Sequence, residues 1–216
     1  MNKYEGFWIV LLVLSVGLAL YYYPQMPDRM ATHWNFEGEA NGYSSRLLGV
    51  FLFPLTMLIM TVLFFVIPRV DPLKKNIEDF LVYYQRFVTF LLIFLIVVFI
   101  QTFLWNKGMK VPIGLIVSVG VGVIFYYSGV LCLKAKQNWF IGIRTPWTLS
   151  SDTVWKKTHQ VGGRLFQVAG ILAVIGVFMG QYAFYFVIVP VLSFTVFIVF
   201  YSYFVYRKEN NKNSKN

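Results

Sequence analysis

Residues 165–206 read LFQVAGILAVIGVFMGQYAFYFVIVPVLSFTVFIVFYSYFVY and contain no charged residue. A single helix of this length, at about 1.5 Å per residue, would be roughly twice as long as the ~30 Å hydrocarbon core of a bilayer. The segment must therefore turn back on itself, and Gly180-Gln181-Tyr182 is the natural break. We predict two membrane-spanning helices here, joined by a short turn.

Four further uncharged apolar runs precede this segment, at residues 6–23, 47–67, 87–105 and 111–133. Each is close to the ~20 residues that a membrane-spanning helix needs. The chain of 216 residues is 58% hydrophobic but only 13% charged, about half the charged fraction of a soluble domain. We therefore predict an all-α fold, an integral-membrane bundle of six helices.

The charges of the loops predict how this bundle is oriented. Six spans place both termini on the same side as loops 68–86 and 134–164, and that side holds 15 of the 19 Lys and Arg residues. The opposite side holds only Arg29, Arg46, Lys107 and Lys110. Because positively charged loops stay in the cytoplasm, we expect both termini to be cytoplasmic. The basic residues sit in short tracts between apolar runs, which favours anionic lipids as partners and disfavours direct binding of nucleic acid.

The spans divide the chain into two halves. Residues 1–105 form an N-terminal three-span half with an extracytoplasmic loop at 24–46. Residues 106–216 form a C-terminal three-span half with a cytoplasmic motif loop at 134–164 and a basic tail. Small residues at helical spacing, such as Gly176 and Gly180, indicate helices that pack closely in lipid.

The sequence carries no strong signal for catalysis. It contains no H-E-x-x-H, G-x-S-x-G or phosphate-binding glycine loop, and the spans contain no charge of the kind that marks ion pathways. The two histidines, His33 and His159, fall on opposite sides of the membrane. We expect that the protein is not an enzyme and that it binds no cofactor and no metal. A zinc site built from His33, Glu37 and Glu39 is a weak alternative.

The outer loop at 24–46 combines turn signals with aromatic residues. Gly38 and the pair Asn41-Gly42 favour turns. The aromatic side chains lie either at the level of the lipid headgroups or on a floor that receives a ligand. Acidic residues slightly outnumber basic ones, so a cationic or amphipathic peptide would not be repelled. The candidate ligand-binding residues are Pro27, His33, Trp34, Asn35, Phe36, Glu37, Glu39 and Tyr43.

The inner loop at 134–164 is denser in specific residues. The stretch NWFIGIRTPWTL at 138–149 precedes a short helix, capped by Ser150 or Ser151 with Asp152 in its first turn. We expect this helix to be interfacial and amphipathic and to lie under the bundle between the fourth and fifth spans. Val154, Trp155 and Thr158 would form its less polar side. The candidate motif residues are Asn138, Gly142, Arg144, Thr145, Pro146, Trp147, Asp152, Trp155, Thr158 and His159.

The two loops together resemble a known family. The stretch IGIRTPWTLS at 141–150, followed by Val154-Trp155-x-x-Thr158-His159, closely resembles the core motif of the SdpI family of bacterial immunity proteins. The outer stretch, with MPDR at 26–29 and HWN at 33–35, resembles an extracytoplasmic domain of unknown function at the N-terminus of the same proteins. The resemblance covers nearly the whole chain.

The resemblance implies a six-helix protein of the bacterial plasma membrane that protects its cell from a secreted peptide, the sporulation-delaying-protein toxin. It also implies signal transduction, in which a toxin-bound receptor holds a cytoplasmic transcriptional repressor at the membrane. In our working hypothesis toxin engages the outer loop, the helices shift, and the inner loop presents Arg144 and the helix around Trp155 to an acidic partner.

Two other functions stay open at this point. The first is a small transporter of peptide or lipid. The second is a membrane-embedded enzyme at the cytoplasmic interface, which would need Asn138, Arg144, Asp152 and His159 to converge on one pocket.

Overall fold

The computed structural model describes residues 2–35 and 37–213, apart from the side chains of residues 181 and 213. Within these residues, six helices are long and apolar enough to cross a membrane, which confirms the predicted six-helix bundle. They are α1 (Lys3–Tyr22), α2 (Arg46–Val70), α4 (Leu81–Asn106), α5 (Ile113–Lys134), α7 (Asp152–Gly176) and α8 (Ala183–Asn213). Short helices α3 (Lys74–Glu78) and α6 (Pro146–Ser150) lie in the connections.

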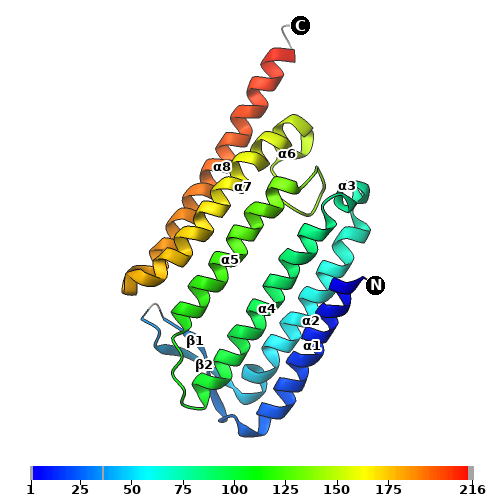
Figure 1. The fold of residues 1–216 in the computed structure, drawn as a ribbon. Helices are drawn as coiled ribbons and strands as arrows, with labels where there is room; N and C mark the ends of the chain where they lie inside the picture. Colours follow the sequence, from blue (N-terminus) through cyan, green and yellow to red (C-terminus); the bar gives the residue numbers. More distant parts are fainter. Residues whose placement is uncertain (1, 36, 214–216) are drawn as a thin grey trace.

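The helices pack in two groups that meet along one seam. Helices α1, α2 and α4 pack against one another, as do α5, α7 and α8, and α4 lies against α5. Figure 1 shows the start of α1 and the end of α8 at the end of the bundle that also carries α3 and α6. We call this the motif end, and we call the opposite end, which carries a β-hairpin, the hairpin end.

The reversal after the fifth span occurs where the sequence predicts it. Helix α7 gives way to a 3-10 segment, Val177–Tyr182, in which Gly180 has φ +55° and ψ −123°. A side chain would be strained in this conformation, so glycine suits the position. Helix α8 then runs back along α7 to the motif end (Figure 1).

The hairpin is the main departure from the predicted all-helical fold. Strands β1 (Arg29–Trp34) and β2 (Ala40–Ser45) pair in antiparallel fashion, with an irregularity in register between Ala31 and Trp34. The turn signal at Gly38 is real, because this residue has φ +82°. The strands are short and polar and carry little of the alternation that identifies a strand from sequence.

The separate interfacial helix is not present in the structure. Residues 152–160 form the first turns of α7 instead, because nothing between Asp152 and Arg164 interrupts the helix. The predicted cap is correct: the Ser151 hydroxyl accepts a hydrogen bond from the backbone N–H of Val154 at 3.2 Å. The expected apolar side, with Val154, Trp155 and Thr158, is fully buried in the bundle and does not face a membrane surface.

Helices α5 and α7 approach until their backbones touch. A Cβ added at Gly170 would lie 2.5 Å from the carbonyl oxygen of Gly122, and one added at Gly163 would lie 2.9 Å from that of Gly129. Real Cβ atoms do not come so close. Glycines on both helices therefore allow the contact, as small residues do in membrane bundles.

Candidate functional site

The hairpin is fixed to the helices by Asn106, the last residue of α4. Its side-chain oxygen accepts a hydrogen bond from the backbone N–H of Ala31 at 2.8 Å, and its amide nitrogen donates to the Ala31 carbonyl at 3.0 Å. Below the strands, Met26 and Met30 are buried in a cluster with Val50 and Phe99. The hairpin is therefore packed on the helices through buried residues, while other residues of both strands stay exposed.

Most of the described residues that were predicted for ligand binding are exposed in the hairpin or beside it. Pro27, His33, Glu37, Glu39 and Tyr43 are exposed, whereas Trp34 and Asn35 are half-buried. Phe36 lies outside the described residues.

Several of these side chains are held by contacts within the hairpin end. The His33 Nδ1 atom lies 2.6 Å from the Asn41 side-chain oxygen. The Arg29 guanidinium lies 5.1 Å from the Tyr43 ring centre, and Trp34 meets Trp105 edge to face at 5.7 Å. An ordered surface of aromatic and charged groups results.

The zinc alternative is not supported by this geometry. Among the described residues, no group of three or more His, Cys, Asp and Glu side chains is arranged to hold a metal ion. His33 is engaged by Asn41 and not by the two glutamates.

At the motif end, Asn138 shapes the start of the motif loop. Its side-chain nitrogen donates to the carbonyls of Lys136 and Ile141, and its oxygen accepts from the backbone N–H groups of Phe140 and Ile141, all within 2.6–3.0 Å. The residue is fully buried. A side-chain amide donates through its nitrogen and accepts through its oxygen. Asn138 uses both groups on backbone atoms of residues 136–141, and these bonds hold the loop in a tight turn.

His159 holds the next turn of the loop. Its Nε2 atom accepts a hydrogen bond from the backbone N–H of Ile143 at 3.0 Å, which places the proton on Nδ1, 2.9 Å from the Trp155 carbonyl. The imidazole also stacks on the Trp155 ring at 3.9 Å. Gly142 has φ +113°, and a Cβ there would collide with Nε2. His159 is thus a buried positioning residue for the loop.

A cluster of hydroxyl groups joins the loop to α8. The Thr145 hydroxyl caps α6 by accepting from the Thr148 N–H at 3.2 Å, and the Thr148 hydroxyl accepts from the Thr145 N–H at 2.8 Å. Pro146 occupies the first turn of α6, where it loses no hydrogen bond. The Thr145 hydroxyl also bonds to Ser202 of α8 at 3.1 Å, and Trp147 contacts Tyr203.

Asp71 links the motif loop to the other group of helices. Its two carboxylate oxygens accept from the backbone N–H groups of Leu73 at 2.7 Å and Trp139 at 2.9 Å. Beside it, Asn76 donates to the Gln137 carbonyl at 2.7 Å. Sequence reasoning missed Asp71, Asn76 and Ser202, because each is a single polar residue whose partner in the motif loop lies 57–68 positions away.

The four residues required by the enzyme alternative do not converge. Asn138 is saturated by backbone groups of its own loop, and His159 is bonded to Ile143 of the loop and to the Trp155 carbonyl of its own helix. Asp152 is exposed and pairs with Lys156 at 2.6 Å, and Arg144 is exposed with one hydrogen bond to the Trp139 carbonyl at 3.1 Å. The geometry therefore favours a structural motif over a reactive pocket.

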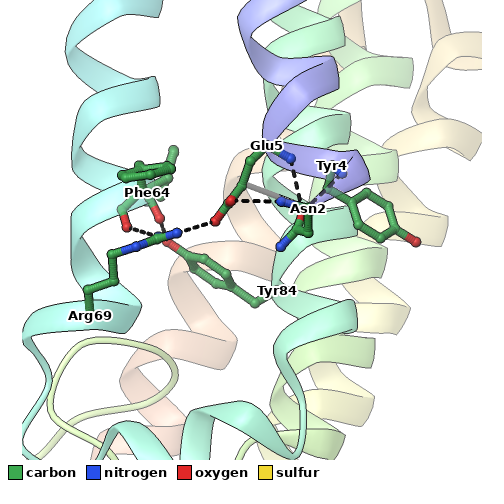
Figure 2. Close-up of polar contacts among 7 residues, drawn as sticks. Asn2, Tyr4, Glu5, Phe64, Arg69 and Tyr84 are labelled. Atoms are coloured by element: carbon green, nitrogen blue, oxygen red, sulfur yellow. Dashed lines mark hydrogen bonds and ion pairs between the residues drawn. The ribbon is translucent and has the colours of Figure 1, made fainter.

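Figure 2 shows a charged pair that joins α1 to α2 at the motif end. The Arg69 guanidinium lies 2.6 Å from the carboxylate of Glu5, whose side chain is only 6% exposed. The second Glu5 oxygen accepts from the backbone N–H of Asn2 at 3.1 Å, which completes a capping box for α1. Nearby, the Tyr84 hydroxyl donates to the Phe64 carbonyl at 2.9 Å.

Comparisons with known proteins match both loops. A model of the SdpI/YfhL protein family matches residues 134–202, and a domain of unknown function, DUF1648, matches residues 10–58. The chain is 32% identical over 203 residues to a protein named Immunity protein SdpI from Bacillus subtilis (strain 168), covering 94% of this chain and 95% of that protein. The chain belongs to the SdpI/YfhL family. No solved structure matches it.

Membership of the SdpI/YfhL family agrees with the geometry on several points. With six apolar helices, this member is a multi-pass protein of the bacterial cell membrane. The SdpI/YfhL match spans every motif residue from Asn138 to His159 and reaches Ser202. The hairpin lies within the DUF1648 match. Asp71, which bonds to Trp139 of the motif loop, lies between the two matched regions in sequence.

Proposed function

We propose that this protein is a membrane immunity protein that protects its cell against a secreted toxin peptide. The observation that carries the proposal is the 32% identity, over nearly the full length of both chains, to a protein named as an immunity protein. Loop charges support an outward-facing hairpin end, since 15 of the 19 Lys and Arg residues lie toward the motif end.

The hairpin is the surface best suited to meet a peptide from outside. His33, Glu39 and Tyr43 project from a hairpin whose backbone is already held by Asn106 and by buried methionines. A preorganised surface loses little conformational entropy on binding. Its mixture of carboxylates and aromatic rings suits a cationic or amphipathic peptide.

We also propose that the motif end is the output of the protein, where a cytoplasmic repressor is held after toxin binds. Helix α4 runs from the hairpin anchor at Asn106 to the motif end, and Asp71 ties the loop after α2 to Trp139. Trp155 itself is buried and cannot be presented to a partner. The exposed basic side chains there include Arg144 and Lys157. Toxin shifts such a bundle only if its affinity differs between two conformations.

The test of immunity is survival of a sensitive bacterium that expresses the protein. Cells are challenged with the sporulation-delaying toxin and with a panel of other membrane-active peptides. We expect protection against one peptide, reduced by Trp34→Ala or His33→Ala and retained by Gln25→Ala, an exposed residue outside the strands.

Two results would contradict the proposal. Protection against none of the peptides, with membrane expression confirmed by immunoblot, would favour the transport alternative. Protection that persists in both hairpin variants would show that the toxin is recognised elsewhere than at the hairpin.

A further inference from the structure

A cavity of about 440 Å³ opens between the two groups of helices at the motif end. Phe64 of α2 and Phe87 of α4 line one side, and Leu131 of α5 and Val199 of α8 line the other. Residues 140–145 of the motif loop also line it. Helices α2 and α8, which contribute to its two sides, are not among the pairs of helices that pack closely.

Arg144 is the one charged side chain that lines this mostly apolar cavity, whose other polar lining residues are Tyr84, Ser128, Thr145 and Thr195. Arg144 is exposed and donates one hydrogen bond to the Trp139 carbonyl. It has no ion pair among the described residues, whereas Arg69, Lys136 and Lys156 each pair with a carboxylate. Its remaining guanidinium N–H groups are therefore available to an anion from outside the protein.

We propose that this cavity binds one anionic phospholipid of the surrounding bilayer. An acyl chain enters between α2 and α8 and lies against Phe64, Phe87 and Val199, while the phosphate accepts hydrogen bonds from Arg144. The cavity volume is within the range of ordinary ligand pockets. Basic groups between spanning helices on the cytoplasmic side suit lipid phosphates, and a guanidinium matches phosphate geometry.

A lipid explains both parts of the cavity. A soluble anion would leave the aromatic and aliphatic walls without an apolar partner, and a neutral lipid would leave Arg144 without a counter-charge. The motif loop fixes where that charge sits: Gly142 turns at φ +113°, and His159 holds the N–H of Ile143, the residue before Arg144. The proposal does not depend on toxin recognition by the hairpin, although Arg144 also belongs to the motif-end surface proposed for the repressor.

The test uses the full chain in lipid nanodiscs with diazirine-tailed phosphatidylglycerol, compared with the same tail on phosphatidylcholine. We expect light-induced adducts on the peptides that contain Phe64 and Val199. Phosphatidylglycerol should label about fivefold more strongly, the preference that one basic residue confers near an anionic surface. Arg144→Ala should reduce that ratio to about one, and the matched control Lys157→Ala, an exposed cation outside the cavity, should leave it unchanged.

A second variant tests the apolar part of the site. Thr195 is an exposed residue of α8 that lines the cavity, so Thr195→Phe should fill it without disturbing the bundle and reduce labelling by both lipids. Gel filtration and circular dichroism confirm that each variant is folded. Equal labelling by both lipids, a preference unaffected by Arg144→Ala, or labelling unaffected by Thr195→Phe would each overturn the proposal.

Discussion

Asn106 and Ala31 are 75 positions apart in sequence, yet one side chain takes up both polar backbone groups of the other residue. This contact fixes β1 to the end of α4. It gives the hairpin a defined position on the helices. The order of the candidate toxin-binding surface therefore depends on the side chain of Asn106.

Changing Asn106 to Ala should loosen the hairpin. Two lost hydrogen bonds of about 1 kcal/mol each predict roughly thirtyfold faster amide exchange in residues 29–45. Hydrogen–deuterium exchange with mass spectrometry measures the change, and toxin survival should fall with it. Lys107→Ala, at the next position and outside the hairpin contacts, is the control. Unchanged exchange in Asn106→Ala would show that the buried methionines alone hold the strands.

Changing Gly142 to Ala should strongly destabilise the protein. The alanine would have to adopt φ +113°, and its Cβ would collide with the His159 imidazole. Gly38→Ala is a matched control, because φ there is +82° but no atom of a described, non-adjacent residue lies within 4 Å of the added Cβ. Backbone strain alone costs about 1–2 kcal/mol, so Gly142→Ala should lower the melting temperature clearly more than Gly38→Ala. Equal shifts would mean that the motif loop moves away from His159 at little cost.

Changing Gly129 to Leu should separate α5 from α7. A side chain at this position meets the Gly163 carbonyl and the backbone of Gln167. Gly114→Leu lies on the same helix with no atom within 4 Å, and it should be neutral or stabilising by up to about 1 kcal/mol, since leucine favours helix more than glycine does. Thermal unfolding of detergent-solubilised protein compares the two. A similar melting temperature for both variants would contradict the close approach of the helices.

The two partners of the Glu5–Arg69 pair should respond unequally to removal. Arg69→Ala leaves a carboxylate that is 6% exposed without its counter-charge, whereas Glu5→Gln leaves a guanidinium that is 47% exposed and can reach water. Breaking a pair costs most when a buried charge is left alone. We expect Arg69→Ala to lower the melting temperature more than Glu5→Gln does, and the double variant to recover part of the loss. The reverse order would indicate that Arg69 depends on Glu5 more than Glu5 depends on Arg69, in spite of the contacts of Arg69 with the Phe65 carbonyl and ring.

The membrane helices could be predicted from sequence because their signal is local. An apolar run has to be long enough to cross the bilayer, and residues 165–206 are too long for one crossing and contain a glycine where the reversal occurs. The cap at Ser151 is local in the same sense, because its hydroxyl bonds three residues ahead.

The hairpin and the interior of the motif had no such local signal. The strands depend on Asn106, far along the chain, and on Met30 packing under them. Trp155 reads as the apolar side of a surface helix, but α7 continues into the bundle and buries it. Asp71 and Ser202 are single polar residues at helix ends, and their partners become visible only when the two groups of helices meet.

The turn around Asn138 closes through contacts that span only residues 136–141. Local contacts form quickly, because little chain entropy is lost in closing them. This turn can therefore take shape during synthesis, before α7 and α8 have entered the bilayer. His159 and Ser202 bond to Ile143 and Thr145, follow this turn in the chain and are synthesised after it. The contacts within the turn therefore do not require those later residues.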